Sequence, residues 1–155
     1  MKIKKFTELN ERDLDLIIDK HFNHWVKFSP TMVLEHTIHK FKNLYANNDE
    51  MPFGIAMFEN DNLIGFCVLQ KERLDKYPHF SPWITSMLIF EEFRGKGNGK
   101  KMVEEALKFL STLGYKKAYL WTDQTPDFYK KLGFSFVQIV EKNEGGTAEL
   151  FSIDI

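Results

Sequence analysis

Apolar and polar residues repeat along the chain in two periods, one typical of strands and the other of helices. Residues 2–6, KIKKF, predict a short first strand. After Asn10, residues 11–22 carry apolar side chains at helical spacing, with Asn10 as the N-cap. Residues 29–45 predict a second helix that begins with Ser29 as cap and Pro30 at the first helical position.

The middle of the chain changes to strand patterns. Residues 53–58 and 63–70 are two apolar runs on either side of ENDN, residues 59–62, which predicts a hairpin. Residues 82–90, PWITSMLIF, predict a further strand, which is followed directly by a glycine-rich stretch. Residues 100–114 then predict the clearest helix of the chain, with Gly114 as its stop.

The C-terminal part predicts a strand at 116–121, a short helix at 125–133 that Pro126 begins, and two strands at 134–140 and 148–155. The order of elements is therefore β-α-α-β-β-β-α-β-α-β-β. Early strands that meet as hairpins and later strands that cross over through helices predict an α/β fold of one mixed sheet with helices on both faces.

Composition supports a globular protein with one domain over residues 1–155. The chain has 155 residues, of which 43% are hydrophobic and 15% aromatic, and its formal net charge is −1. This composition argues against disorder, and the charge gives no general attraction to nucleic acid or to an anionic membrane. A site for an anion would therefore depend on locally clustered charge.

The single cysteine, Cys67, excludes an internal disulfide and a multi-cysteine metal site. It lies in the apolar run LIGFCVL, so we expect a buried, unreactive thiol rather than a nucleophile. The N-terminal residues become acidic before any apolar run of signal-peptide length, and no run is long enough to span a bilayer. These features predict a cytoplasmic protein.

The stretch EEFRGKGNGKKM, residues 91–102, contains three glycines in alternate positions among four cations. It lies between a predicted strand and a predicted helix, where backbone N–H groups without intrahelical partners and the helix dipole favour a phosphate. The P-loop pattern does not fit, because position 94 is arginine and Lys101 follows Lys100. The dinucleotide pattern GxGxxG also fails, because position 100 is lysine where its last glycine would stand. A solvated glycine turn with solubilising lysines remains the alternative.

Two segments resemble landmarks of the GNAT acetyltransferase superfamily. RGKGNG, residues 94–99, is similar to the family's R/Q-x-x-G-x-G/A signature between a strand and a helix. DFYKKLGF, residues 127–134, is similar to its Tyr-x-x-x-Gly-Phe segment near the C-terminus. The order of elements also suits that fold, although residues in the N-terminal third match in pattern only. The resemblance implies a predominantly antiparallel sheet with one splayed parallel pair of strands, WITSMLI and KKAYLW.

The resemblance implies that acetyl-CoA is the cosubstrate and that it binds in the gap between those two strands. Its pantetheine arm would pair with backbone groups around Leu88 and Ile89, where a backbone amide would polarise the acetyl carbonyl. Its pyrophosphate would lie on the loop and the start of the following helix, at Arg94, Gly95, Lys96, Gly97, Asn98, Gly99 and Lys100. Thr122 stands where many members carry a cofactor-contacting asparagine, so that contact falls to Thr122, Asp123 or Gln124. Glu91 also replaces a frequent proline.

The resemblance also implies catalytic roles. Tyr129 matches the family's general-acid tyrosine, with core packing beside Phe128 as the alternative. A phenol suits the role because it holds its proton until a strong base appears. No motif identifies the general base. Glu72 is the first candidate and Glu91 the second, and each could equally be a solvated surface charge.

Two histidine pairs, His21 with His24 and His36 with His39, each share a face of a predicted helix. Neither belongs to a metal-binding pattern, so no metal is expected and surface histidines are favoured. In the GNAT family the N-terminal helices border the acceptor site, which makes Trp25, Phe28, Glu35 and Trp83 candidate acceptor contacts; the two tryptophans could equally be core.

Taken together, these features predict an N-acetyltransferase that moves the acetyl group of acetyl-CoA to a primary amine by direct attack. The acceptor is a small-molecule amine or a protein amine, with no nucleic acid or membrane partner, and a homodimer is compatible with the chain. The alternative is a non-catalytic module of the same fold that binds acyl-CoA or docks a partner.

Overall fold

The computed structural model describes all residues from Met1 to Ile155. Seven strands make one sheet. The strands are β1 (Lys2–Lys5), β2 (Phe53–Glu59), β3 (Asn62–Gln70), β4 (Trp83–Ile89), β5 (Lys117–Thr122), β6 (Ser135–Glu141) and β7 (Thr147–Asp154). The α-helices are α1 (Glu11–His24), α2 (Leu34–His39), α3 (Asn98–Thr112) and α4 (Pro126–Lys131). Short helical turns are η1 (Phe6–Glu8), η2 (Val26–Phe28), η3 (Lys40–Tyr45) and η4 (Glu91–Phe93), of which η3 is a π-helix. The predicted order of elements is confirmed.

The sheet has the order β1-β2-β3-β4-β5-β7-β6. Every neighbouring pair is antiparallel except β4 and β5, which run parallel and share one residue pair, Trp83 with Tyr119. The two parallel strands therefore separate from that point onward, and the edge of β4 that faces β5 has no strand partner beyond it. The predicted mixed sheet with one splayed parallel pair is confirmed.

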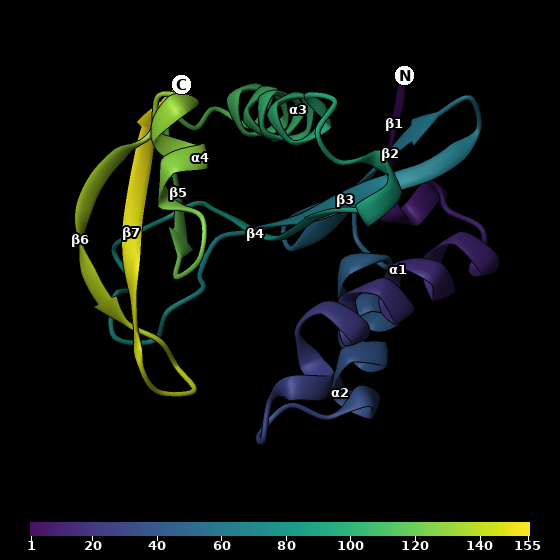
Figure 1. Cartoon of the computed structure of the whole chain (residues 1–155), viewed down its shortest axis with the longest axis horizontal. Helices are drawn as coiled ribbons and strands as arrows, with labels where there is room; N and C mark the ends of the chain where they lie inside the picture. The colour runs from purple at the N-terminus through teal and green to yellow at the C-terminus, as the bar shows by residue number, and fades with distance from the viewer.

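Helices cover both faces of the sheet. On one face, α3 buries Met102, Val103, Ala106 and Leu110 against strands β2 to β5. On the other face, α1 and η3 bury Ile17, Phe41 and other apolar side chains against β2, β3 and β4. Figure 1 shows α3 on one side of the strands and α1 with α2 on the other. The apolar stripes read from the sequence thus form two separate cores with the sheet between them.

The prediction for the second helix is wrong at its start. Ser29 does not cap a helix; its hydroxyl accepts a hydrogen bond from the amide of Met32 at 3.2 Å within a turn. Helix α2 begins only at Leu34. Met32 and Val33 are exposed, so a longer helix would bury no apolar face, and β-branched Val33 favours the extended backbone that it adopts.

Local signals at several other boundaries are confirmed. Asn60 and Asp61 both have positive φ in the β2–β3 turn, as a tight hairpin turn requires. Asn10 caps α1 by accepting a hydrogen bond from the amide of Asp13 at 2.8 Å. After α3, the amide of Tyr115 donates to the Leu110 carbonyl at 3.1 Å across Gly114.

The segment around the glycines differs in detail from the prediction. The turn η4 separates β4 from the glycines, and α3 begins at Asn98, two residues before the predicted start.

Among the helices, none combines the length and the apolar character that crossing a membrane would need.

Candidate functional site

The open edge of β4 is the first part of the site. Leu88 and Ile89 pair with Phe66 and Gly65 of β3 on one side, and no strand pairs with them on the other. Their side chains are buried, while the Ile89 carbonyl accepts a hydrogen bond from Arg94 Nε at 2.8 Å. An unpaired strand edge is a surface onto which an extended chain can add as a further strand.

A β-bulge interrupts β4 next to this edge. Ser86 and Met87 stand opposite Cys67 alone, because Leu88 pairs with Phe66 and Thr85 pairs with Val68. Ser86 adopts a φ of 49°, in the left-handed region that a non-glycine residue rarely enters. A bulge of this kind redirects backbone groups out of the ladder, and such features concentrate beside active sites. The sequence offered no signal for this bulge.

The glycine loop lies beyond η4, where α3 begins. Gly95 and Gly97 have φ values of 74° and 81°, and a Cβ at either position would meet nothing within 4 Å. The first intrahelical bond of α3 runs from the Lys101 amide to the Gly97 carbonyl at 3.2 Å. The amides of residues 98–100 therefore have no intrahelical partner, and the approach to them from the two glycines is open. This arrangement suits an anion at a helix N-terminus.

The side chains of the loop contact either its own backbone or the helix that follows it. Asn98 is buried and donates from Nδ2 to the Phe93 carbonyl at 3.0 Å, so its amide group closes the turn that α3 follows. Lys96 lies near the Glu92 carbonyl, and Lys100 lies 4.0 Å from Glu104. Gly99 faces the ring of Phe128 on α4, to which an added Cβ would approach within 3.0 Å.

Tyr129 of α4 packs against the core cluster that contains Cys67, as does Met87 of the bulge. Its ring lies edge-on to those of Phe128 and Phe134, with centroid separations of 5.0 and 5.8 Å. Burial, and then the neighbouring Cys67, raise the pKa of Tyr129 to about 12. Cys67 itself is fully buried, which raises its pKa, so the expectation of an unreactive thiol is confirmed.

Thr122 ends β5 and is buried. Its hydroxyl oxygen lies 3.0 Å from the Thr125 amide and 3.3 Å from the Gln124 amide, and accepts a hydrogen bond from each. The hydroxyl therefore shapes the turn into α4. Asp123 pairs with Lys142 at 3.1 Å and Gln124 is exposed.

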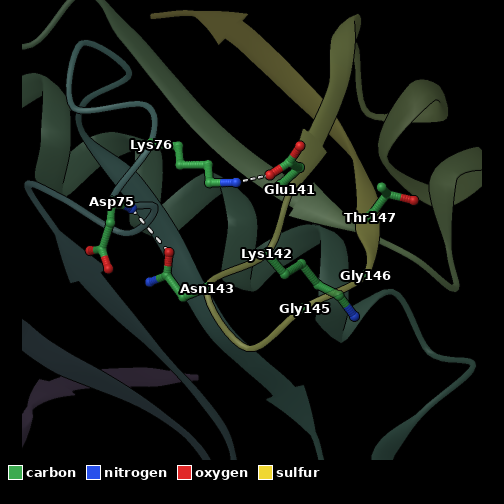
Figure 2. Close-up of a pocket in the computed structure, with 8 residues that line it drawn as sticks. All are labelled: Asp75, Lys76, Glu141, Lys142, Asn143, Gly145, Gly146 and Thr147. Atoms are coloured by element: carbon green, nitrogen blue, oxygen red, sulfur yellow. Dashed lines mark hydrogen bonds and ion pairs between the residues drawn. The ribbon is translucent and has the colours of Figure 1, made fainter.

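Glu72 is exposed on the connection that follows β3, and Glu91 is exposed in η4. The connection between β3 and β4 meets the β6–β7 turn, and a polar hollow of about 460 Å³ lies between them. Figure 2 shows the residues that line it. Its walls include the ion pair of Lys76 with Glu141 and the hydrogen bond from the Asp75 amide to Asn143 Oδ1 at 3.0 Å. No hydrophobic residue lines this hollow.

The four candidate acceptor contacts do not lie together in one environment. Trp83 is fully buried and donates from Nε1 to the Phe80 carbonyl at 2.6 Å, so it is a core residue. Trp25 is half-buried against His21 and His24. Phe28 is 75% exposed, and Glu35 is exposed in the first turn of α2.

The histidine pairs differ in burial. His21 is 7% exposed and lies between the rings of Trp25 and Phe41, and its Nδ1 atom has no hydrogen-bond partner. The expectation of a surface histidine is therefore wrong for His21, because this face of α1 packs onto the sheet. Burial, followed by the charges of Lys40, His24 and Arg73, lowers the pKa of His21 to about 4. No group of three or more acidic, histidine or cysteine side chains could hold a metal ion.

Sequence reasoning missed a polar group on the face of the sheet that α1 covers. Gln70 Nε2 donates to the Tyr45 hydroxyl at 3.3 Å and to Thr85 Oγ1 at 3.1 Å. Thr85 immediately precedes the bulge residue Ser86. Gln70 was readable only as the polar end of an apolar strand, because its partners come from segments distant in the sequence.

The site combines an open strand edge, a β-bulge, a helix N-terminus with free amides and a half-buried tyrosine on α4. This combination is expected of an acyl-CoA-dependent transferase. A family model described as the Acetyltransferase (GNAT) family matches residues 18–134, and the chain belongs to this family. No curated protein sequence matches the chain.

Solved structures show the same fold. An aminoglycoside 6'-N-acetyltransferase complexed with coenzyme A superposes with a TM-score of 0.75 at 17% identity, covering 99% of this chain and 97% of that chain. The aminoglycoside 6'-N-acetyltransferase from Enterococcus faecium has a TM-score of 0.72 at 17% identity, with 99% and 97% covered. A GNAT family acetyltransferase from Elizabethkingia anophelis with acetyl-CoA bound has a TM-score of 0.55 at 18% identity, with 66% and 75% covered.

Proposed function

We propose that this acetyltransferase transfers the acetyl group of acetyl-CoA to the nitrogen of a primary amine, with Tyr129 as the general acid. The observation that carries the proposal is the splayed β4–β5 pair, with the free N-terminal amides of α3 and the half-buried phenol of α4 on the same face of the sheet. Structures described with coenzyme A or acetyl-CoA bound share this fold.

The residues of the gap fit an acyl-CoA in two places. The amides of residues 98–100 would bind the pyrophosphate, with Gly95 and Gly97 leaving room for its close approach and the nearby lysines adding charge. The free edge of β4 at Leu88 and Ile89 would hydrogen-bond the pantetheine arm. Thr122 acts in this proposal through the turn that its hydroxyl holds, which places α4.

Acetyl-CoA supplies a thioester: the amine nitrogen bonds to the carbonyl carbon, the carbon–sulfur bond breaks, and the sulfur leaves with the electron pair. Tyr129 donates its phenolic proton to that sulfur. The nitrogen loses one proton to solvent on becoming an amide, and the phenolate regains a proton from solvent. Its raised pKa keeps the proton in place at neutral pH until the thiolate forms. A backbone amide of β4 at the bulge would polarise the carbonyl oxygen, as in an oxyanion hole.

The attacking nitrogen must be neutral, so an ammonium acceptor first loses a proton. Glu72 is the proposed base; because its side chain is exposed, it would act through a water molecule rather than by direct contact. A Glu72→Gln variant should then lower kcat/KM for the amine and leave the Kd for acetyl-CoA unchanged. An unchanged kcat/KM would remove Glu72 from this role.

Release of free thiol from acetyl-CoA, measured over a chemically diverse panel of amines, tests the proposed function. Thiol release that depends on a particular amine, with the acetylated amine found by mass spectrometry, is the expected result. Binding of acetyl-CoA in calorimetry without amine-dependent release would instead support a non-catalytic acyl-CoA-binding module. Absence of binding at millimolar acetyl-CoA would contradict both.

A further inference from the structure

Arg73 is fixed between the two halves of the sheet. It lies three residues beyond Gln70, at which β3 ends, and its guanidinium carbon is 5.4 Å from the centre of the Trp121 ring on β5. Asn143, from the β6–β7 turn, donates from Nδ2 to the Arg73 carbonyl at 3.0 Å and accepts from the Asp75 amide through Oδ1. Figure 2 shows the second of these contacts. Backbone and side chain of Arg73 are thus both positioned.

The guanidinium of Arg73 has no acidic partner. Arg73 is half-buried, yet it takes part in none of the ion pairs of the structure. By contrast, Lys142, which lies 5.5 Å from the same Trp121 ring, is paired with Asp123 at 3.1 Å. A half-buried guanidinium without a carboxylate retains its donors for an anion from outside the chain, and its planar geometry matches a carboxylate or a phosphoryl group.

The charge of Arg73 affects Tyr45, which lies on the side of the sheet next to the bulge. Burial raises the pKa of Tyr45, and the charge of Arg73 opposes that rise. The Tyr45 hydroxyl accepts a hydrogen bond from Gln70, which also donates to Thr85, the neighbour of bulge residue Ser86. Arg73 is therefore within electrostatic range of the polar group that borders the proposed reaction centre.

The charged neighbours that lower the pKa values of His21 and His24 are all cations. Burial comes first in lowering the pKa of His21, followed by Lys40, His24 and Arg73. For His24 burial is followed by the charge of Arg94. An acceptor with several positive charges would be repelled here, whereas one with a negative charge would be attracted.

From this placement we propose that the acceptor is an amine that also carries an anionic group, a carboxylate or a phosphoryl group, and that Arg73 binds that group. The proposal rests on the proposed function, since it names the acceptor class for the same site. It separates this chain from the aminoglycoside acetyltransferases that share its fold, because aminoglycosides are polycations.

The test compares acceptors that differ only in the anionic group. Thiol release from acetyl-CoA would be measured with amino acids against their carboxamides, and with 2-aminoethylphosphonate against propylamine. An aminoglycoside serves as the polycationic acceptor. We expect kcat/KM to be at least tenfold higher for one anionic member than for its neutral analogue, and the aminoglycoside to be poor. The amino acid and phosphonate pairs distinguish the carboxylate from the phosphoryl group.

Arg73→Gln should lower kcat/KM for the preferred anionic acceptor by about 10- to 100-fold and leave the neutral analogue within a factor of two or so. Lys142→Gln, which removes a paired cation from the same tryptophan ring, is the matched control and should change the preference little. Equal rates for acids and carboxamides, or equal losses for both with Arg73→Gln, would overturn the proposal alone. Absence of thiol release with every amine would overturn the proposed function and this proposal with it.

Discussion

A tyrosine in water loses its proton near pH 10. In this protein burial among aromatic rings, and then the neighbouring Cys67, raise the pKa of Tyr129 to about 12. Both effects destabilise the phenolate form, which has little solvent around it. The side chain therefore remains a proton donor throughout the physiological range, and it lies on the same core cluster as the bulge residue Met87.

Removal of the phenol should affect the chemical step and leave cofactor binding intact. We expect Tyr129→Phe to lower kcat by about 10²-fold or more, the usual range for loss of a positioned acid, with an unchanged Kd for acetyl-CoA. Tyr115→Phe is the control, because Tyr115 is half-buried against the same core at the opposite end of α3. A kcat within a factor of two or so of the wild type would assign the proton to another donor.

Much of the candidate site can be proposed from the sequence at the level of residues, because the two GNAT landmark segments assign particular side chains to particular positions along the chain. Tyr129 and the glycines fall in that class. Arg73 and Gln70 do not, since their roles depend on Trp121, Tyr45 and Asn143, which lie far away in the sequence. Contacts of that kind are set by the register of the sheet, which short-range patterns do not encode.

At the scale of elements, α3 presents its two ends differently although both use a glycine with positive φ. Gly97 precedes the first turn, with a φ of 81°, and Gly114 follows the last turn, with a φ of 91°. A Cβ at either position would meet nothing within 4 Å. Only the first lies beside amides that have no intrahelical partner. Substitutions at the two glycines therefore distinguish the effect of backbone strain from an effect on ligand binding.

We expect Gly97→Ala and Gly114→Ala to destabilise the fold by similar amounts, about 1–2 kcal/mol, the cost of an L-residue in the left-handed region. Only Gly97→Ala should also raise the Kd for acetyl-CoA, by about tenfold. Urea unfolding and calorimetry would measure the two effects. Equal Kd values for the two variants would show that the loop does not bind the phosphates.

Prediction of elements succeeded where the apolar periodicity and the residues that end an element agreed, as in α3 with its apolar stripe and Gly114. It failed at the start of α2, where Ser29 and Pro30 form a convincing N-terminal signal in front of side chains that find nothing to pack against. The bulge in β4 also escaped prediction, because a serine within an apolar strand does not by itself mark an irregularity.

At the scale of the whole molecule, His21 lies where α1 packs on the sheet, with Lys40, His24 and Arg73 as its charged neighbours. Its pKa is lowered from 6.5 to about 4. Between these two pH values, His21 binds a proton in the unfolded chain but not in the folded chain. Stability is therefore unaffected by this group above about pH 6.5 and falls as the pH drops from there toward 4.

We expect His21 to contribute a loss of about 2–3 kcal/mol between pH 7 and pH 4.5, estimated from the size of its pKa shift. His21→Leu should remove that part of the pH dependence of the free energy of unfolding, measured in urea at each pH. His36→Leu, which changes an exposed histidine of α2, is the control. Identical pH dependence in wild type and His21→Leu would contradict this account.

The single residue pair that joins β4 to β5 has a thermodynamic consequence. An acyl-CoA bound along the free edge of β4 would replace the hydrogen bonds that a continuous ladder would otherwise supply. At a concentration of 100 times its Kd it should raise the free energy of unfolding by about 2.7 kcal/mol. That corresponds to a rise of about 5–10 °C in Tm for a chain of this size, which differential scanning calorimetry would detect.

The same pair is also the only ladder pairing between strands β1 to β4 on one side and strands β5 to β7 on the other. Without a ligand, backbone amides along the gap should exchange with deuterium faster than those of the β2–β3 hairpin, and a bound acyl-CoA should slow them. A bound cosubstrate would then also make the position of β4 relative to Tyr129 more rigid. Occupancy of the donor site would in this way change the affinity for the acceptor.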